Sequence, residues 1–314
     1  MSTLTITLIQ TEPKWEDKAA NLRSLEEKIL SIRENTELVV LPEMFSTGFS
    51  MRPEVLAESM DGPSLAWMRS VAARKRIILT GSLIIEEKGH YFNRLIWMLP
   101  NGEYGFYDKR HRFAYAGESE HYTAGHKRLV ASVKGWKIMP LVCYDLRFPV
   151  WSRQTPAAGE SEAPAAHSLA GAHTAPSAPA GQPRPASAPP PAPGPNAPAP
   201  PENPAAPNEP PLEYDVLLYV ANWPERRSLA WKTLLQARAI ENQSYVIGVN
   251  RIGNDGNNIY HSGDSMIVGP LGEILYHGMA REEIFTLTLR KETLTDVRQR
   301  FPFWRDADLF SIQP

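Results

Sequence analysis

A long tract of proline and alanine limits how this chain can fold. From about Thr155 to Pro211 the sequence consists almost entirely of Pro, Ala, Gly, Ser, Glu and Asn, and this tract holds most of the 29 prolines. Such small and polar side chains bury too little apolar surface to offset the conformational entropy that is lost on ordering. We therefore predict a disordered insertion at residues 155–211. Residues 1–154 and 212–314 are expected to form one domain together, because neither part alone supplies both a complete sheet and the helices to cover it.

Outside this tract, the apolar residues alternate between the repeat of a helix and that of a strand. Helical spacing is found at residues 22–32, 65–76 and 228–242. Short apolar runs that are typical of buried strands cover residues 38–41, 77–86, 92–99, 104–108, 136–143, 214–221 and 245–250, and a hairpin is expected at residues 265–276. Helices and strands that alternate in this way predict an α/β fold.

The charge and the cysteine content narrow the possible functions. The 33 basic and 35 acidic residues leave a formal net charge of −2, which gives no reason to expect nucleic acid or an anionic membrane as a partner. One cysteine cannot form an intramolecular disulfide, and eight scattered histidines do not indicate a metal site. The sequence shows no secretion signal and no apolar run long enough to span a membrane. We therefore expect a cytoplasmic protein that acts on a small molecule.

Three reactive side chains lie at or just after the ends of predicted strands. Glu43 follows the run 38–41, Lys109 follows the run 104–108, and Cys143 ends the run 136–143. Taken singly, such a cysteine is more often a core residue, and such a glutamate or lysine is more often a solvated charge. In a layered α/β fold, however, strand ends can meet at one edge, where ligand sites are common. A thiol, a carboxylate and an ammonium group together suffice for acyl transfer without a cofactor.

Three segments around these residues resemble the signature segments of the nitrilase superfamily, in the same order along the chain. They are residues 41–45 (LPEMF), residues 107–111 (YDKRH) and residues 141–149 (LVCYDLRFP). Three later segments resemble the omega-amidase branch in particular: residues 219–224 (YVANWP), 236–242 (QARAIEN) and 263–265 (GDS). The resemblance covers nearly everything outside the tract at residues 155–211.

This resemblance implies a four-layer α-β-β-α sandwich that acts as a homodimer. It also implies that Glu43 is the general base, that Cys143 is the nucleophile, and that Lys109 stabilises the oxyanion together with the backbone N–H of Tyr144. A second glutamate of the family orients the lysine and the substrate. Glu118 is the expected match, and the nearby Glu120 is the alternative.

The omega-amidase branch acts on short 2-oxo acids that carry a terminal amide, such as 2-oxoglutaramate. The resemblance therefore implies a small amide substrate with a carboxylate and a basic residue that binds it. Arg147, Arg226 and Arg227 are the candidates, although each could be an ordinary surface charge. The residues expected to line the pocket are aromatic: Phe45, Tyr144 and Trp223.

Three other functions remain open at this point. A papain-like thiol hydrolase would use His111 or His261 as its base, but the usual sequence around such a cysteine is missing. A nitrilase proper would act on a nitrile with the same Glu, Lys and Cys, because these residues do not fix the bond that is cleaved. A binding protein could instead use the proline-rich tract at residues 155–211 to recruit SH3-like or WW-like partners.

Overall fold

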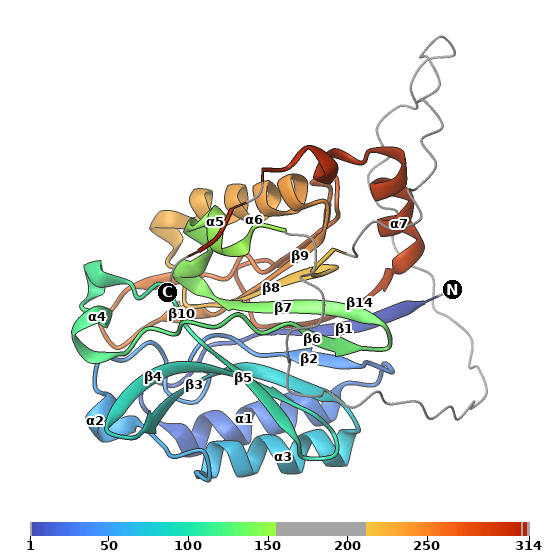
Figure 1. Ribbon diagram of the computed structural model, residues 1–314. Coiled ribbons are helices and arrows are strands. Elements are labelled where there is room, and N and C mark those ends of the chain that lie inside the picture. The colour runs from blue at the N-terminus through green and yellow to red at the C-terminus, as the bar shows by residue number, and fades with distance from the viewer. Residues whose placement is uncertain (1, 155–211, 309, 313–314) are drawn as a thin grey trace.

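The computed structural model describes residues 2–154, 212–308 and 310–312 (Figure 1). Within these ranges, two large sheets pack face to face, and helices cover the outer face of each sheet. The fold is therefore α/β with four layers, and the expected α-β-β-α sandwich is confirmed. The insertion predicted at residues 155–211 lies outside the described residues.

The first sheet is built mainly from the N-terminal part of the chain. Its strand order is β14 (Glu283–Arg290), β1 (Thr3–Gln10), β2 (Leu38–Val40), β3 (Ile78–Glu87), β4 (His90–Met98) and β5 (Tyr104–Asp108). Strands β1, β2 and β3 run parallel, whereas β4 and β5 each reverse direction. Because two reversals restore the original direction, the carboxyl ends of β2 and β5 lie at the same edge of the sheet, next to the amino end of β4.

Two long helices cover the outer face of this sheet: α1 (Lys18–Ser31) and α3 (Pro63–Lys75) (Figure 1). Asp17 caps α1, because its side chain accepts a hydrogen bond from the backbone N–H of Ala20 at 3.0 Å. Leu25 and Ile29 lie one turn apart on α1 and are buried against the sheet. The helices predicted from residues 22–32 and 65–76 are thus confirmed.

The second sheet combines strands from both sides of residues 155–211. Its order is β13 (Ile274–His277), β12 (Met266–Val268), β9 (Tyr245–Asn250), β8 (Val216–Ala221), β7 (Trp136–Val142) and β6 (Ala131–Val133). The parallel strands β7, β8 and β9 form its centre, and almost all of their residues are buried. Burial on both faces explains why these strands appear in the sequence as unbroken apolar runs. Helices α5 (Pro149–Ser152) and α6 (Ser228–Asn242) cover the outer face (Figure 1).

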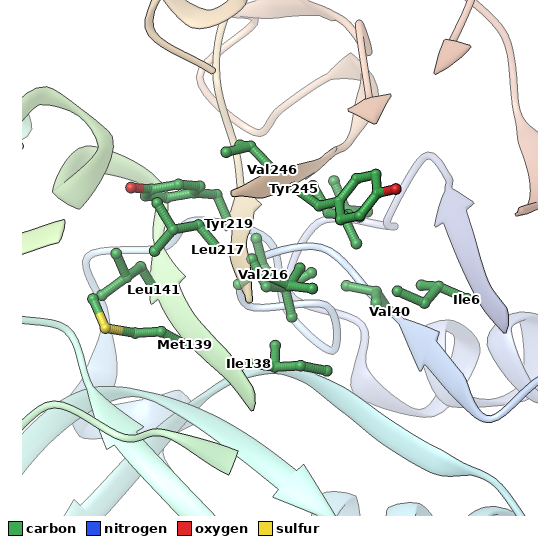
Figure 2. Packing of buried hydrophobic residues seen from close by; sticks show 14 of the residues in the cluster. Ile6, Val40, Ile138, Met139, Leu141, Val216, Leu217, Tyr219, Tyr245 and Val246 are labelled. Carbon is green, nitrogen blue, oxygen red and sulfur yellow. The ribbon is translucent and has the colours of Figure 1, made fainter. Parts of the chain in front are cut away.

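The main hydrophobic core lies between the two sheets. Figure 2 shows Ile6 and Val40 of the first sheet beside Ile138 and Val216 of the second, and all four belong to one cluster of buried residues. A shared core of this size joins the two sheets into one packed body. None of the helices in the described ranges combines the length and the apolar character needed to cross a membrane.

The chain leaves and re-enters the second sheet at neighbouring points. Gln154 donates a hydrogen bond from Nε2 to the carbonyl of Tyr214 at 2.8 Å, and its Oε1 accepts one from the backbone N–H of Tyr214 at 3.1 Å. Strand β7 before the tract and strand β8 after it pair in parallel over five residues, from Ile138↔Val216 to Val142↔Val220. The two flanks of residues 155–211 are therefore adjacent in space.

Some elements were not predicted from the sequence. Strand β14 pairs antiparallel with the whole of β1, and helix α7 (Lys291–Arg300) follows it. Strand β14 lies at the edge of its sheet and buries only Leu289 fully, so its apolar signal is weak. The small hairpin of β10 (Ile252–Asn254) and β11 (Tyr260–Ser262) is too short to give a periodic pattern. The remaining short helices are α2 (Pro53–Leu56) and α4 (Glu118–His121).

Candidate active site

Three buried side chains meet where one edge of the first sheet faces the second. Glu43 and Lys109 follow β2 and β5, and Cys143 follows β7. Glu43 is fully buried, Lys109 is 1% exposed and Cys143 is 8% exposed. Lys109 Nζ lies 2.9 Å from Glu43 Oε1, and both Lys109 and Cys143 line one cavity. The structure thus brings together the three reactive residues that the sequence placed at strand ends.

Lys109 is held between two carboxylates. Its Nζ donates to Glu43 Oε1 at 2.9 Å and to both oxygens of Glu118 at 3.0 and 2.9 Å. Burial alone lowers the pKa of Lys109, but the charges of Glu118 and then Glu43 outweigh it and raise the pKa above its usual value. Lys109 is therefore a fixed ammonium group. Glu120, the alternative to Glu118, is exposed to solvent.

Two asparagines that sequence reasoning did not assign to the site complete this network. Asn93, near the start of β4, donates from Nδ2 to Glu43 Oε1 at 2.8 Å and to Glu118 Oε1 at 3.2 Å. Asn222 follows β8 and donates its backbone N–H to Glu43 Oε2 at 2.9 Å, and its Nδ2 to the Glu43 carbonyl at 2.6 Å. Both oxygens of the Glu43 carboxylate are thus held in place. In the sequence, Asn93 and Asn222 could have been found as polar residues that lie within or just after an apolar strand.

A strained turn presents Cys143. This residue has a φ of +45°, in the left-handed region that non-glycine residues seldom adopt, and it begins the 3-10 turn Cys143–Arg147. Asp145 stabilises the turn, because its carboxylate accepts hydrogen bonds from Val142 N at 3.0 Å, Tyr107 Oη at 2.8 Å and His111 N at 3.0 Å. The buried Asp145 thereby ties the cysteine turn to the segment that carries Lys109.

The surroundings of the Cys143 sulfur favour its neutral thiol form. Burial, and then the negative charge of Glu43, raises the pKa of the thiol well above its usual value, while the charge of Lys109 opposes this shift. The thiol points at the carbonyl of Asn222, with 3.9 Å between sulfur and oxygen. A base must therefore take the proton when the sulfur reacts.

The cavity above Cys143 has a volume of about 290 Å³, which suits a small molecule. Tyr144 and Trp223 line it, as expected. The expectation for Phe45 is wrong: this ring is fully buried in the core of the first sheet, 5.8 Å from the ring of Trp67. Phe45 occupies the space above Gly81 of β3, where the missing side chain leaves room for the ring. Phe49, four residues later, lines the cavity instead.

All three candidate arginines lie in the cavity wall. Arg147 and Arg226 are exposed, and the guanidinium carbon of Arg147 lies 5.0 Å from the centre of the Trp223 ring. Arg227 is half-buried, with its guanidinium carbon 4.9 Å from the centre of the Phe113 ring. The mouth of the cavity is therefore positively charged and suits an anionic ligand.

Neither candidate histidine contacts the sulfur within the described ranges. The Nδ1 atom of His111 lies 2.8 Å from Asp145 Oδ1, and its ring stacks on Phe148. His261 lines the cavity, but burial, and then the charge of Arg251, lowers its pKa to about 4. In the part of the chain that the structure describes, no group of three or more His, Cys, Asp or Glu side chains could hold a metal ion. The arrangement that can perform acyl transfer is a thiol beside a carboxylate and an ammonium group.

Comparison with known proteins places this geometry in a family. Residues 5–168 and 213–299 match the family model for carbon-nitrogen hydrolases. The omega-amidase YafV of Escherichia coli (strain K12) is 36% identical over 314 residues, which covers 99% of this chain and 100% of the relative. The 2-oxoglutaramate amidase of Bacillus subtilis (strain 168) is 25% identical over 305 residues, which covers 96% of each chain.

A solved structure has the same architecture. This is the crystal structure of XC1258 from Xanthomonas campestris, a CN-hydrolase superfamily protein with an arsenic adduct in its active site. It matches this fold with a TM-score of 0.80 at 36% sequence identity, and the match covers 100% of both chains.

Proposed function

Because the chain belongs to the carbon-nitrogen hydrolase family and is an amidase, we propose that it hydrolyses the terminal amide of a small 2-oxo dicarboxylic acid monoamide. The model substrate is 2-oxoglutaramate, and the products are the dicarboxylic acid and ammonia. The observation that carries this proposal is the meeting of Cys143, Glu43 and Lys109 at a cavity of about 290 Å³. The names of the two relatives, omega-amidase and 2-oxoglutaramate amidase, support the substrate class.

In the first half of the reaction, Glu43 accepts the proton of Cys143 as the sulfur attacks the amide carbon. Proton transfer accompanies the attack, because the raised pKa of Cys143 favours the neutral thiol. The C=O bond becomes an oxyanion, which the ammonium of Lys109 and the backbone N–H of Tyr144 stabilise. Glu118 and Asn93 hold Lys109 and Glu43 in position. The C–N bond then breaks, the nitrogen takes the proton from Glu43, and ammonia leaves a thioester on the sulfur.

In the second half, water attacks the thioester carbon while Glu43 accepts a proton from it. The C–S bond breaks, the sulfur recovers its proton, and the acid product leaves. One carboxylate thus acts as base and acid in turn, which requires it to stay in one place between the two halves. The hydrogen bonds to Glu43 from Lys109, Asn93 and Asn222 meet that requirement.

Mass spectrometry with a panel of dicarboxylic half-amides tests the proposal. We expect the acyl group of the preferred substrate to accumulate on Cys143, and ammonia to be released with the same preference. Cys143→Ala and Cys143→Ser should abolish turnover while the circular dichroism spectrum and melting temperature stay close to those of the wild type. Full activity in either variant would remove Cys143 as the nucleophile.

The same assay separates an amidase from a nitrilase. A nitrile of matched chain length is supplied beside each amide, and ammonia release is compared. We expect turnover of the amide to exceed that of the nitrile. Faster release from the nitrile would replace the proposed reaction while leaving the roles of Glu43, Lys109 and Cys143 in place.

We also propose that the enzyme works as a homodimer in the cytoplasm. Light scattering coupled to size-exclusion chromatography should give twice the chain mass of 35.1 kDa. A monomer with full activity would contradict the assembly, and recovery of the protein outside the cytoplasm after cell fractionation would contradict the location.

A further inference from the structure

The wall of the active-site cavity carries more positive than negative charge. Its charged residues are Lys109, Arg147, Arg226, Arg227 and Asp255. The charge of Lys109 is more than offset by the two carboxylates that bind it. Asp255 is occupied within its own loop, because Oδ1 accepts hydrogen bonds from two backbone N–H groups, those of Asn257 and Ile259, at 2.9 Å each. Among the described residues, none of the three arginines forms an ion pair with a carboxylate.

Arg227 differs from the other two arginines in its surroundings. It is half-buried, whereas Arg147 and Arg226 are exposed. Burial, and then the charge of Arg226, lowers the pKa of Arg227, while its attraction to a negative charge on Cys143 raises it. Arg227 and Cys143 line the same cavity, and the guanidinium remains charged at neutral pH. A partly desolvated cation without a counter-ion favours the binding of an anion.

The surroundings also fix where Arg227 points. Its guanidinium lies over the Phe113 ring, and its backbone carbonyl accepts a hydrogen bond from Trp223 Nε1 at 2.8 Å. Phe113 is itself anchored to the catalytic network, because its backbone N–H donates to Glu118. Phe113 therefore connects Arg227 to Glu118, one of the two carboxylates that bind Lys109.

We propose that Arg227 binds the carboxylate of the substrate and thereby makes the enzyme select anionic amides over neutral ones. This inference rests on the proposed amidase function. A guanidinium can bind a carboxylate through two parallel hydrogen bonds, which fixes the orientation of the substrate as well as its charge. The cavity of about 290 Å³ has room for a short acid, and both Cys143 and Arg227 line it.

The test compares a monoamide acid with its methyl ester, which has the same chain but no charge. The value of kcat/KM is measured for both substrates in the wild type, Arg227→Gln, Arg227→Lys and the matched control Arg226→Gln. We expect Arg227→Gln to lower the acid-to-ester ratio of kcat/KM by roughly 10- to 100-fold, mainly through KM, the range for a lost hydrogen bond to a charged group. Arg227→Lys should recover part of the ratio, because lysine keeps the positive charge but cannot form two parallel hydrogen bonds with a carboxylate. Arg226→Gln should change the ratio by less than about threefold, as for other exposed charges.

Two outcomes would overturn the inference. An equal loss of acid and ester turnover in Arg227→Gln would mean that Arg227 supports the reaction itself. An equal change of the ratio in Arg226→Gln would mean that the general positive field selects the anion. Melting temperatures close to that of the wild type establish that the variants are folded.

A binding measurement keeps the inference separate from the proposed function. Calorimetric titration of Cys143→Ala with 2-oxoglutarate reports carboxylate binding without turnover. We expect Arg227→Gln in that background to weaken the affinity by roughly 10-fold or more. Unchanged affinity would overturn the inference even if the enzyme is an amidase. Conversely, a wild type that binds the acid through Arg227 but hydrolyses none of the half-amides would refute the proposed function alone.

Discussion

Gly125 is the position where one added methyl group should disturb catalysis from outside the cavity lining. Its backbone N–H donates to the carbonyl of Lys109 at 3.0 Å, so the two chain segments lie in direct contact. A Cβ atom at Gly125 would lie 2.0 Å from the carbonyl oxygen of Asp108 and 2.7 Å from its carbonyl carbon. Both are backbone atoms, so no change of rotamer can relieve the clash, and the backbone at residue 125 and the segment that carries Lys109 have to move apart.

The size of the effect follows from this geometry. Real Cβ atoms essentially never approach closer than 3.0 Å, so the Asp108 carbonyl and the backbone at residue 125 must separate by about 1 Å. Overpacking of this kind costs about 1–3 kcal/mol. For a domain of this size that corresponds to a loss of roughly 2–10 °C in melting temperature. A displacement of about 1 Å at a catalytic group can cost on the order of 100-fold in rate, and Lys109 is the next residue along the chain.

The assay measures kcat/KM on the preferred half-amide and the melting temperature of Gly125→Ala. Gly105→Ala is the matched control, because its Cβ would meet Leu129 at 3.5 Å, an ordinary van der Waals contact, in the same strand that leads to Lys109. We expect the control to stay within about threefold of the wild type in kcat/KM. Wild-type activity and stability in Gly125→Ala, or an equal loss in the control, would refute the reasoning.

Three further predictions follow from the contacts around the site. Asp145→Asn should lower the free energy of unfolding in urea by about 2–4 kcal/mol and should reduce kcat. The reason is that an amide cannot accept all the hydrogen bonds that Val142, Tyr107 and His111 donate to the carboxylate. Wild-type stability would contradict this. Replacing residues 156–210 with a short Gly-Ser link should preserve turnover, because the two flanks of this tract are adjacent in space and loop closure costs only about 0.6 kcal/mol per doubling of loop length. A folded but inactive protein would contradict this prediction. Iodoacetamide should alkylate Cys143 more slowly than free cysteine at pH 8, with a rate that rises at higher pH, because burial and the charge of Glu43 raise the pKa of the thiol above its usual value. Rapid, pH-independent alkylation near pH 7 would show a thiolate instead.

The sequence was sufficient to predict the strands that position the site. Strands β2, β5 and β7 are short runs followed within three residues by a reactive side chain, and such runs are hard to place anywhere but in a buried sheet. The rule that strand ends share an edge then brings Glu43 and Lys109 together, since β2 and β5 end at the same edge. Cys143 joins them only because the second sheet packs on the first, and that packing cannot be read from local patterns.

The remaining parts of the site depend on contacts between residues far apart in the chain. Asn93 and Asn222 each look like a single polar residue beside an apolar run, and only the packed sheets show that both bind Glu43. The error at Phe45 has a similar origin. The ring follows a strand end, as a pocket residue does, but Gly81 on the neighbouring strand opens a space in the core that it fills. Sequence position alone does not show whether such a ring lines the pocket or fills a space in the core.

Fixing the Glu43 carboxylate requires both halves of the chain. One oxygen accepts from Asn93 of β4 and from Lys109, which follows β5, and the other accepts from Asn222, which comes after residues 155–211 in the chain. The backbone carbonyl of Asn222 also accepts a hydrogen bond from the Cys143 thiol. Base and nucleophile are therefore brought together by a segment that enters the fold only when β8 pairs with β7. Since an unmatched carboxylate beside a buried thiol is costly in a low-dielectric interior, the network that makes the site reactive also makes it dependent on the complete fold.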